Sequence, residues 1–261
     1  MDTLRDLDLV RAIDDRDACA FRAADPGSDV LGELEVKFSP FNKWYRIASW
    51  FEGDFMERTV KGAFKKTIAE NVANMRVQFD HGMDPSIGSK VLGGITSLEE
   101  KSAGPLGLVE LDDTSYNRDL LPGLKRGRYG SSFRFRVIRD EWNDEPGKSD
   151  QNPDGVPERT IKEVRLMEFG PVTWPANPAA TAGVRSATDL YYEALKAKDP
   201  KTYDDMRSSA IALREKTGAA MRTPVPAAAA PEDPTEPAPA TPRIPLSERR
   251  KRALQIRGVI Q

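Results

Sequence analysis

The 261-residue chain contains one histidine and one cysteine, His81 and Cys19. A single thiol excludes an intrachain disulfide and suits a reducing compartment. The usual zinc sites need several cysteine and histidine ligands, which one residue of each kind cannot supply. The sequence also has no EF-hand loop, no Walker sequence and no dinucleotide-binding glycine pattern. We therefore predict that the protein uses no metal and no cofactor.

Long apolar runs and an excess of one charge are missing as well. No apolar run reaches the roughly 20 residues that a membrane helix needs. The N-terminal stretch MDTLRDLDLVRAIDDRD is too charged for a signal peptide. The 39 Lys and Arg residues nearly balance the 41 Asp and Glu residues, giving a net charge of -2. This balance indicates neither a nucleic acid nor a membrane as partner, and we expect a soluble intracellular protein.

Composition divides the chain into an N-terminal arm, a globular domain, a helical appendix, a Pro/Ala-rich linker and a basic C-terminal peptide, at residues 1–30, 31–185, 186–218, 219–245 and 246–261. The arm is polar and shows no clear apolar period, so we predict loose order or one short helix. The appendix carries helix-starting signals at Ser186 and at Asp199-Pro200. The linker cannot bury a core and is predicted to be extended.

Within the globular domain, β-branched and aromatic residues gather in short stretches bounded by turn residues. The predicted strands are Glu33–Phe38, Trp44–Trp50, Met75–Phe79, Val91–Leu98, Leu106–Leu111, Tyr129–Ile138, Thr160–Phe169 and Val172–Trp174. Helices are predicted at Val60–Val72 and Ser115–Leu121, the second stopped by Pro122. Many short strands with few helices favour an α+β, mainly β fold, with a barrel or a folded sheet.

Three polar residues lie in or beside apolar strand-like stretches: His81, Ser132 and Glu168. Each has an ordinary structural interpretation when taken alone. A histidine can be hydrogen-bonded at a loop, a serine is common on strands, and a carboxylate can face solvent. A hydroxyl, an imidazole and a carboxylate are nevertheless the groups from which an activated serine nucleophile is built. Imidazole is the side chain that exchanges a proton near neutral pH.

Six blocks of sequence occur in an order and at spacings that resemble one known family: Trp50–Arg58, Lys61–Phe64, Phe79–His81, Gly104–Leu108, Ser132–Phe135 and Leu166–Asn177. The family is the prohead (capsid maturation) serine protease family of tailed phages, and the resemblance covers roughly residues 33–183. Two positions depart from the family pattern. Gly82 follows the histidine where a small acidic or amide residue is usual, and Gly170 stands where serine is common.

The resemblance implies a serine endopeptidase with Ser132 as nucleophile, His81 as base and Glu168 as third member. Asp80 and Asp84 remain alternatives for the third member. Ser131 remains an alternative nucleophile, because only one of two adjacent strand residues can face the histidine. For the oxyanion, a backbone N–H near Ser132 is the candidate donor, with Arg134 as a weaker one.

The related herpesvirus assemblins use a second histidine, which this chain lacks. Their fold implies a β-barrel with surrounding helices, here followed by C-terminal helices and a disordered tail. Whether the active form is a homodimer, as in the assemblins, stays open.

The resemblance also implies partners and a place of action. Such proteases cleave scaffold segments or the delta domains of the major capsid protein, and often themselves, inside the procapsid in the host cytoplasm. The Pro/Ala tract is an accessible place for self-cleavage. The basic C-terminal peptide is either an encapsidation tag or a solvated tail.

Two other functions remain as alternatives. The first is a catalytically silent scaffolding or assembly protein with a protease-like fold. The second is a nucleic-acid-binding module that uses Arg249–Arg252. The near-neutral total charge opposes the second alternative.

Overall fold

The computed structural model describes residues 7–13, 15, 17–49, 51–173 and 187–217. The chain divides into the units Met1–Val225 and Pro226–Gln261, and all described residues belong to the first. The predicted linker and basic C-terminal peptide, and with them the predicted disordered tail, lie outside the described residues.

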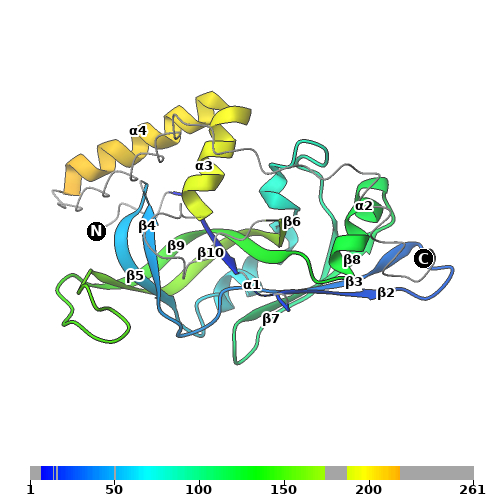
Figure 1. Ribbon diagram of the computed structural model, residues 1–261, viewed down its shortest axis with the longest axis horizontal. Helices are drawn as coiled ribbons and strands as arrows, with labels where there is room; N and C mark the ends of the chain where they lie inside the picture. The colour runs from blue at the N-terminus through cyan, green and yellow to red at the C-terminus, as the bar shows by residue number, and fades with distance from the viewer. Residues whose placement is uncertain (1–6, 14, 16, 50, 174–186, 218–261) are drawn as a thin grey trace, which may run out of the picture. The chain divides into compact units, whose positions relative to one another are not determined.

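The strands form two sheets (Figure 1). The larger sheet has the order β1-β9-β10-β5-β4, with β6 also paired to β10. Its strands are β1 (Leu9–Ile13), β4 (Tyr45–Ser49), β5 (Gly53–Thr59), β6 (Arg76–Val77), β9 (Gly130–Asn143) and β10 (Glu158–Val172). The smaller sheet has the order β2-β3-β8-β7, with β2 (Cys19–Ala23), β3 (Val30–Lys37), β7 (Gly93–Glu100) and β8 (Pro105–Asp112). Only β10 makes parallel pairs among these strands, with β5 and with β6.

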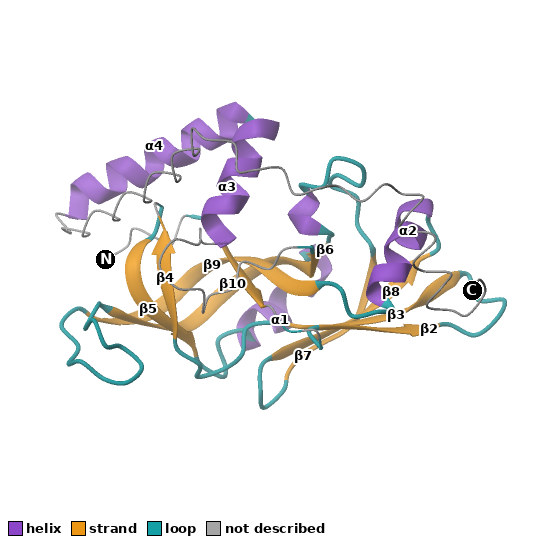
Figure 2. Ribbon diagram, viewed as in Figure 1, coloured by secondary structure: helices purple, strands orange, loops and turns teal. Residues whose placement is uncertain are grey.

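The α+β, mainly β class is confirmed, and Figure 2 shows strands predominating over helices. A closed assemblin-like barrel is not confirmed, because the described strands form two open sheets. The larger sheet ends at β1 and β4, and the smaller one ends at β2 and β7. The long strand β10 pairs with β5 near its start and with β6 near its end. Strands β5 and β6 therefore occupy different parts of the same edge of β10, and the sheet does not close.

The prediction of a loose arm or a short helix in residues 1–30 is wrong for two stretches. Leu9–Ile13 is strand β1, paired antiparallel with β9, and Cys19–Ala23 is strand β2, paired with β3. Each strand has five residues, too few for an apolar period to stand out between polar flanks. Strand β1 also has a buried charged residue, Arg11, at its centre. A hydropathy pattern therefore does not indicate that β1 lies in the interior.

The helices are α1 (Lys65–Asn71), α2 (Ser115–Leu124), α3 (Ala187–Lys198) and α4 (Pro200–Thr217), with short turns η1 (Val72–Asn74) and η2 (Asp80–Gly82). Helix α2 continues past Pro122, where we predicted its end, and the Lys125 N–H donates to the Leu121 carbonyl. Helices α3 and α4 lie where the capping signals predicted them. None of the helices in the described ranges is long and apolar enough to cross a membrane.

Four phenylalanines form the part of the core that orients β9 and β10. The Phe38 ring lies 5.0 Å from Phe169, 5.3 Å from Phe133 and 5.7 Å from Phe64, measured between centroids. Such aromatic contacts bury large areas and favour specific ring geometries. Because strand side chains alternate between faces, burial of Phe133 on one face turns its neighbour Ser132 toward the other. The same alternation turns Glu168 away from Phe169.

Candidate active site

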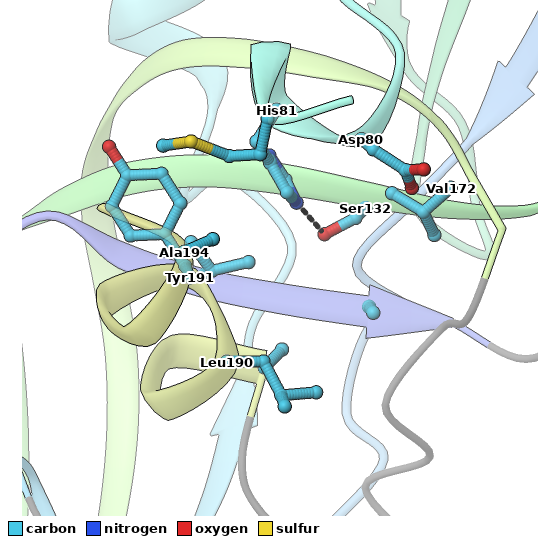
Figure 3. Close-up of a pocket in the computed structure, with 11 residues that line it drawn as sticks. Asp80, His81, Ser132, Val172, Leu190, Tyr191 and Ala194 are labelled. Carbon is cyan, nitrogen blue, oxygen red and sulfur yellow. Dashed lines mark hydrogen bonds between the residues drawn. The ribbon is translucent and has the colours of Figure 1, made fainter. Parts of the chain in front are cut away.

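Ser132 lies on β9, between Ala12 of β1 and Gly170 of β10. Its Oγ is 2.7 Å from His81 Nε2 (Figure 3). The adjacent hydroxyl of Ser131 donates instead to the Lys37 carbonyl, at 2.5 Å. The two serines thus occupy opposite faces of the strand, as the side-chain alternation requires. The structure brings Ser132, and not Ser131, to the histidine.

His81 lies in turn η2 and not at the end of a strand, because β6 already ends at Val77. Three successive residues have positive φ there: Asp80 at 45°, His81 at 57° and Gly82 at 72°. For residues other than glycine this conformation costs about 1–3 kcal/mol each and persists only where the surroundings impose it. The Asp80 carboxylate accepts from Thr173 N and Oγ1, at 2.9 and 2.8 Å. These bonds fix the turn and with it the imidazole.

Glu168 lies on β10, and its Oε2 is 2.6 Å from His81 Nδ1. Only 1% of its side chain is exposed, against 10% for that of His81. The other two candidates for this place have different partners. Asp80 accepts from Thr173, and Asp84 Oδ1 accepts from the N–H groups of Ser86 and Ile87. Of these three carboxylates, Glu168 is thus the one that hydrogen-bonds to the imidazole.

The three contacts define where the hydrogens can lie. A charged carboxylate only accepts, so the hydrogen between Glu168 and the ring belongs to His81 Nδ1. Nε2 is then an acceptor, placed to receive the hydrogen of Ser132 Oγ. The Arg11 carbonyl, 2.8 Å from the same Oγ, is a competing acceptor. The serine hydroxyl therefore has two resting orientations, of which the one toward His81 precedes proton transfer.

A pocket of about 140 Å³ lies beside Ser132 and His81 (Figure 3). Its walls come from β1, β10, the η2 region and helix α3, and most of the lining side chains are apolar: Val10, Ala12, Met83, Val172, Leu190 and Ala194. Figure 3 shows Leu190, Tyr191 and Ala194 on one helix beside the serine. A volume of this size suits one apolar side chain next to the reacting hydroxyl.

The two glycines that depart from the family pattern have steric explanations. A Cβ at Gly170 would lie 2.0 Å from the Gln78 carbonyl oxygen, so a serine does not fit unless the backbone moves. The close approach lets the segment leading to His81 run beside β10. Gly82 has a φ of +72°, and a Cβ there would lie 3.1 Å from Ser89 Cα. Glycine is the residue that accepts such a conformation at little cost.

Two neighbours of the site carry no signal in the sequence. Strand β1 supplies the Arg11 carbonyl, and Tyr191 of α3 stands edge-on to the His81 ring, with centroids 6.0 Å apart. Arg134, the weaker candidate for the oxyanion, contacts Asp8 and Tyr191. The expected backbone donor near Ser132 stays a prediction. Within the described ranges, no group of three or more His, Cys, Asp or Glu side chains is placed to hold a metal ion.

A family model described as "Caudovirus prohead serine protease" matches residues 25–193, well over half of the chain. A solved structure, that of the bacteriophage T4 capsid assembly protease gp21, is 14% identical and covers 64% of this chain and 98% of that chain, with a TM-score of 0.38. At these values the structural similarity carries no argument. No curated protein matches.

Proposed function

Because the chain belongs to the caudovirus prohead serine protease family, we propose that Ser132, His81 and Glu168 are its nucleophile, base and orienting carboxylate. One observation carries the proposal. The three side chains form an unbroken series of hydrogen bonds, 2.7 Å from Ser132 Oγ to His81 Nε2 and 2.6 Å from Nδ1 to Glu168 Oε2. They come from β9, η2 and β10, which only the tertiary fold brings together.

The geometry supports acyl transfer in two steps. Ser132 Oγ attacks the carbonyl carbon of the scissile peptide while His81 Nε2 takes its proton, and Glu168 stabilises the resulting imidazolium. The imidazolium then gives that proton to the departing amine, which leaves an ester on Ser132. Water attacks the ester, His81 takes a proton from the water, and the proton returns to Ser132 Oγ. The enzyme is restored, and one peptide bond and one water are consumed.

Family membership supports the substrate assignment. The substrates are scaffold segments or the delta domain of the major capsid protein, together with the chain itself, and cleavage takes place inside the procapsid in the host cytoplasm. The self-cleavage region of the proposal is residues 219–245, because their Pro/Ala-rich composition predicts a linker that a protease cleft can reach. The pocket beside Ser132 receives an apolar substrate side chain next to the scissile bond.

One observation favours the alternative of a catalytically silent assembly protein. Ser132 exposes only 1% of its surface, and the Arg11 carbonyl offers its hydroxyl a second acceptor. The strained turn at His81 weighs against this alternative, because backbone strain of this kind is typical of functional sites. The hydrogen bonds of the imidazole to a serine and to a carboxylate are explained by catalysis and not by an assembly role.

Mass spectrometry of the purified chain, alone and after co-expression with its capsid protein, tests the proposal. Wild type, Ser132→Ala and Ser131→Ala are compared, the last as a matched control from the opposite face of β9. We expect discrete cleavage by wild type and by Ser131→Ala, and none by Ser132→Ala. Equal cleavage by all three would assign the activity to a host enzyme. Absence of cleavage in all three would favour the silent assembly protein.

A further inference from the structure

Two buried polar atoms lack hydrogen-bond partners among the described residues close to the proposed triad. They are Glu168 Oε1 and Arg134 Nε. Glu168 and Arg134 are directly paired across β10 and β9, so their side chains leave the same face of the sheet. Cross-strand pairs of this kind have Cβ atoms about 4.5–5.5 Å apart. An unsatisfied buried donor beside an unsatisfied buried acceptor requires an explanation, because such groups are rare in folded proteins.

The far end of Arg134 is anchored on two sides. Its Nη1 donates to Asp8 Oδ2 at 3.1 Å and to the Tyr191 hydroxyl at 3.2 Å. The guanidinium carbon lies 5.6 Å from the centre of the Tyr191 ring. Burial is the largest influence and lowers the pKa of Arg134, but Tyr191, Glu168 and Asp8 together raise that pKa above its ordinary value. The guanidinium is therefore a positive charge anchored on the same face of the sheet as Glu168, with no hydrogen bond between the two side chains.

From this arrangement we propose that Arg134 is a positioning residue whose positive charge, on the same face of the sheet as Glu168, keeps that carboxylate charged, so that Oε2 accepts from His81 Nδ1. The inference rests on the proposed function, because it gives Arg134 a role only through the triad. Asp8 and Tyr191 act one step further away, by holding the guanidinium in place.

The charge on Glu168 decides which nitrogen of His81 can act as base. With a charged carboxylate, the ring hydrogen lies on Nδ1 and Nε2 accepts from Ser132. A protonated Glu168 would donate to Nδ1, and the ring hydrogen would move to Nε2, which then could not take the serine proton. Loss of the positive charge of Arg134 favours protonation of Glu168 and of the imidazole. Either protonation abolishes the form in which Nε2 accepts from Ser132, so this form should be lost at a higher pH.

Other charged groups near the triad stay constant in this comparison. Asp80 is bound to Thr173, and Lys198 Nζ donates to the Gly82 carbonyl at 2.7 Å. Arg76, the partner of Glu168 on β6, is exposed, and its Nη1 donates to the Met75 carbonyl. Burial raises the pKa of Tyr191, which keeps its hydroxyl neutral. Of the two arginines paired with Glu168, Arg134 is thus the partly buried one, with 25% of its side chain exposed.

The test compares Arg134→Gln, Arg134→Lys and Arg136→Gln. Arg136 is a matched control, because its Nε also donates to Asp8, at 2.6 Å, but its partner across β10 is Arg165 and not Glu168. The rate at which a fluorophosphonate labels Ser132 is measured from pH 5 to pH 9, together with circular dichroism of each variant.

We expect Arg134→Gln to move the acid limb of the profile up by about one pH unit, which is about a tenfold lower rate on that limb. Arg134→Lys keeps the positive charge, so its acid limb should lie close to that of wild type. Arg136→Gln should leave the acid limb where it is in wild type. An unchanged limb in Arg134→Gln, or an equal shift in Arg136→Gln, would overturn the inference.

The single histidine gives a second readout that needs no activity. In protein without an affinity tag, nitrogen NMR of the one imidazole distinguishes the form with hydrogen on Nδ1 from the other forms. We expect this form to disappear at a higher pH in Arg134→Gln than in wild type, and the same pH in both would contradict the inference. A wild type that is never labelled at Ser132 would instead refute the proposed function, and the NMR comparison would still decide the role of Arg134.

Discussion

Replacing Glu57 with glutamine is expected to lower the free energy of unfolding by about 3 kcal/mol at pH 7. Glu57 is fully buried. Its Oε1 accepts from Arg11 Nε and from the Tyr45 hydroxyl, both at 2.7 Å. Its Oε2 accepts from Arg11 Nη2 at 3.0 Å and from Arg159 Nη1 at 3.3 Å. Glutamine keeps the shape but removes the charge that balances two buried guanidinium groups.

The size of the expected loss in the free energy of unfolding follows from the contacts that Arg11 and Arg159 keep after the substitution. Breaking a buried ion pair costs about 3–5 kcal/mol, because a charge is left without compensation. The lower end applies here, since Arg11 keeps its two contacts with Glu52 and Arg159 keeps Asp140. A loss of this size is a large part of the about 5–15 kcal/mol that stabilises a typical domain. It would also loosen β1, whose Arg11 carbonyl lies beside Ser132.

The pH dependence has a definite sign. Burial raises the pKa of Glu57, but Arg11, Arg159 and the hydrogen bonds outweigh burial and hold that pKa below its ordinary value of 4.5. The contribution of Glu57 is therefore fully present above pH 4.5 and is lost as the pH falls through the lower folded-state value. The difference in stability between wild type and Glu57→Gln should close in the same interval.

Urea unfolding between pH 7 and pH 3 measures both quantities. Glu99→Gln is the control, because Glu99 pairs with Lys101 while more than half of each side chain is exposed, and such pairs contribute about 0–1 kcal/mol. A loss below about 1 kcal/mol for Glu57→Gln at pH 7, or a difference that stays constant down to pH 3, would refute this reasoning.

Three further predictions concern other parts of the fold. Burial raises the pKa of the Cys19 thiol to about 12, so iodoacetamide at pH 8 should modify native protein no faster than it unfolds; rapid modification would contradict this. Gly170→Ala should reduce cleavage by about 100-fold, because its Cβ would displace Gln78 and the turn beyond it; Gly147→Ala, with open space around it, should be neutral, and equal effects would count against the steric argument. Ala194→Trp should fill the pocket beside Ser132 and reduce cleavage without lowering the melting temperature; unaltered cleavage would remove the pocket from the substrate path.

The sequence allowed most strands of the globular domain and both C-terminal helices to be predicted, because their apolar periods and capping residues are local signals. Strand β5 was missed, and β10 was predicted as two separate strands. The alternation of strand side chains predicted that only one of Ser131 and Ser132 faces the histidine, and the family resemblance favoured Ser132. The structure places Ser132 at the histidine and Ser131 at the Lys37 carbonyl. The association of Glu168 with His81 could be proposed only from the family resemblance, because 87 positions separate them.

Three features could not be predicted, for physical reasons that differ. Strand β1 is stabilised by pairing with β9, more than a hundred residues away, and has no local period of its own. Arg11 and Arg159 resemble surface residues in a sequence but are buried, because carboxylates from other strands balance them. The positive φ at His81 occurs in a turn that contacts β10 and Lys198 of α3, so the sequence placed His81 beside a strand but gave no sign of the turn's conformation.

Peptide mapping by mass spectrometry after fluorophosphonate treatment tests the central claim most directly. If Ser132 is a nucleophile activated by His81, the wild type should carry the adduct on Ser132, and His81→Ala should carry none under the same conditions. An adduct on Ser131, or equal labelling of Ser132 in wild type and His81→Ala, would contradict the account.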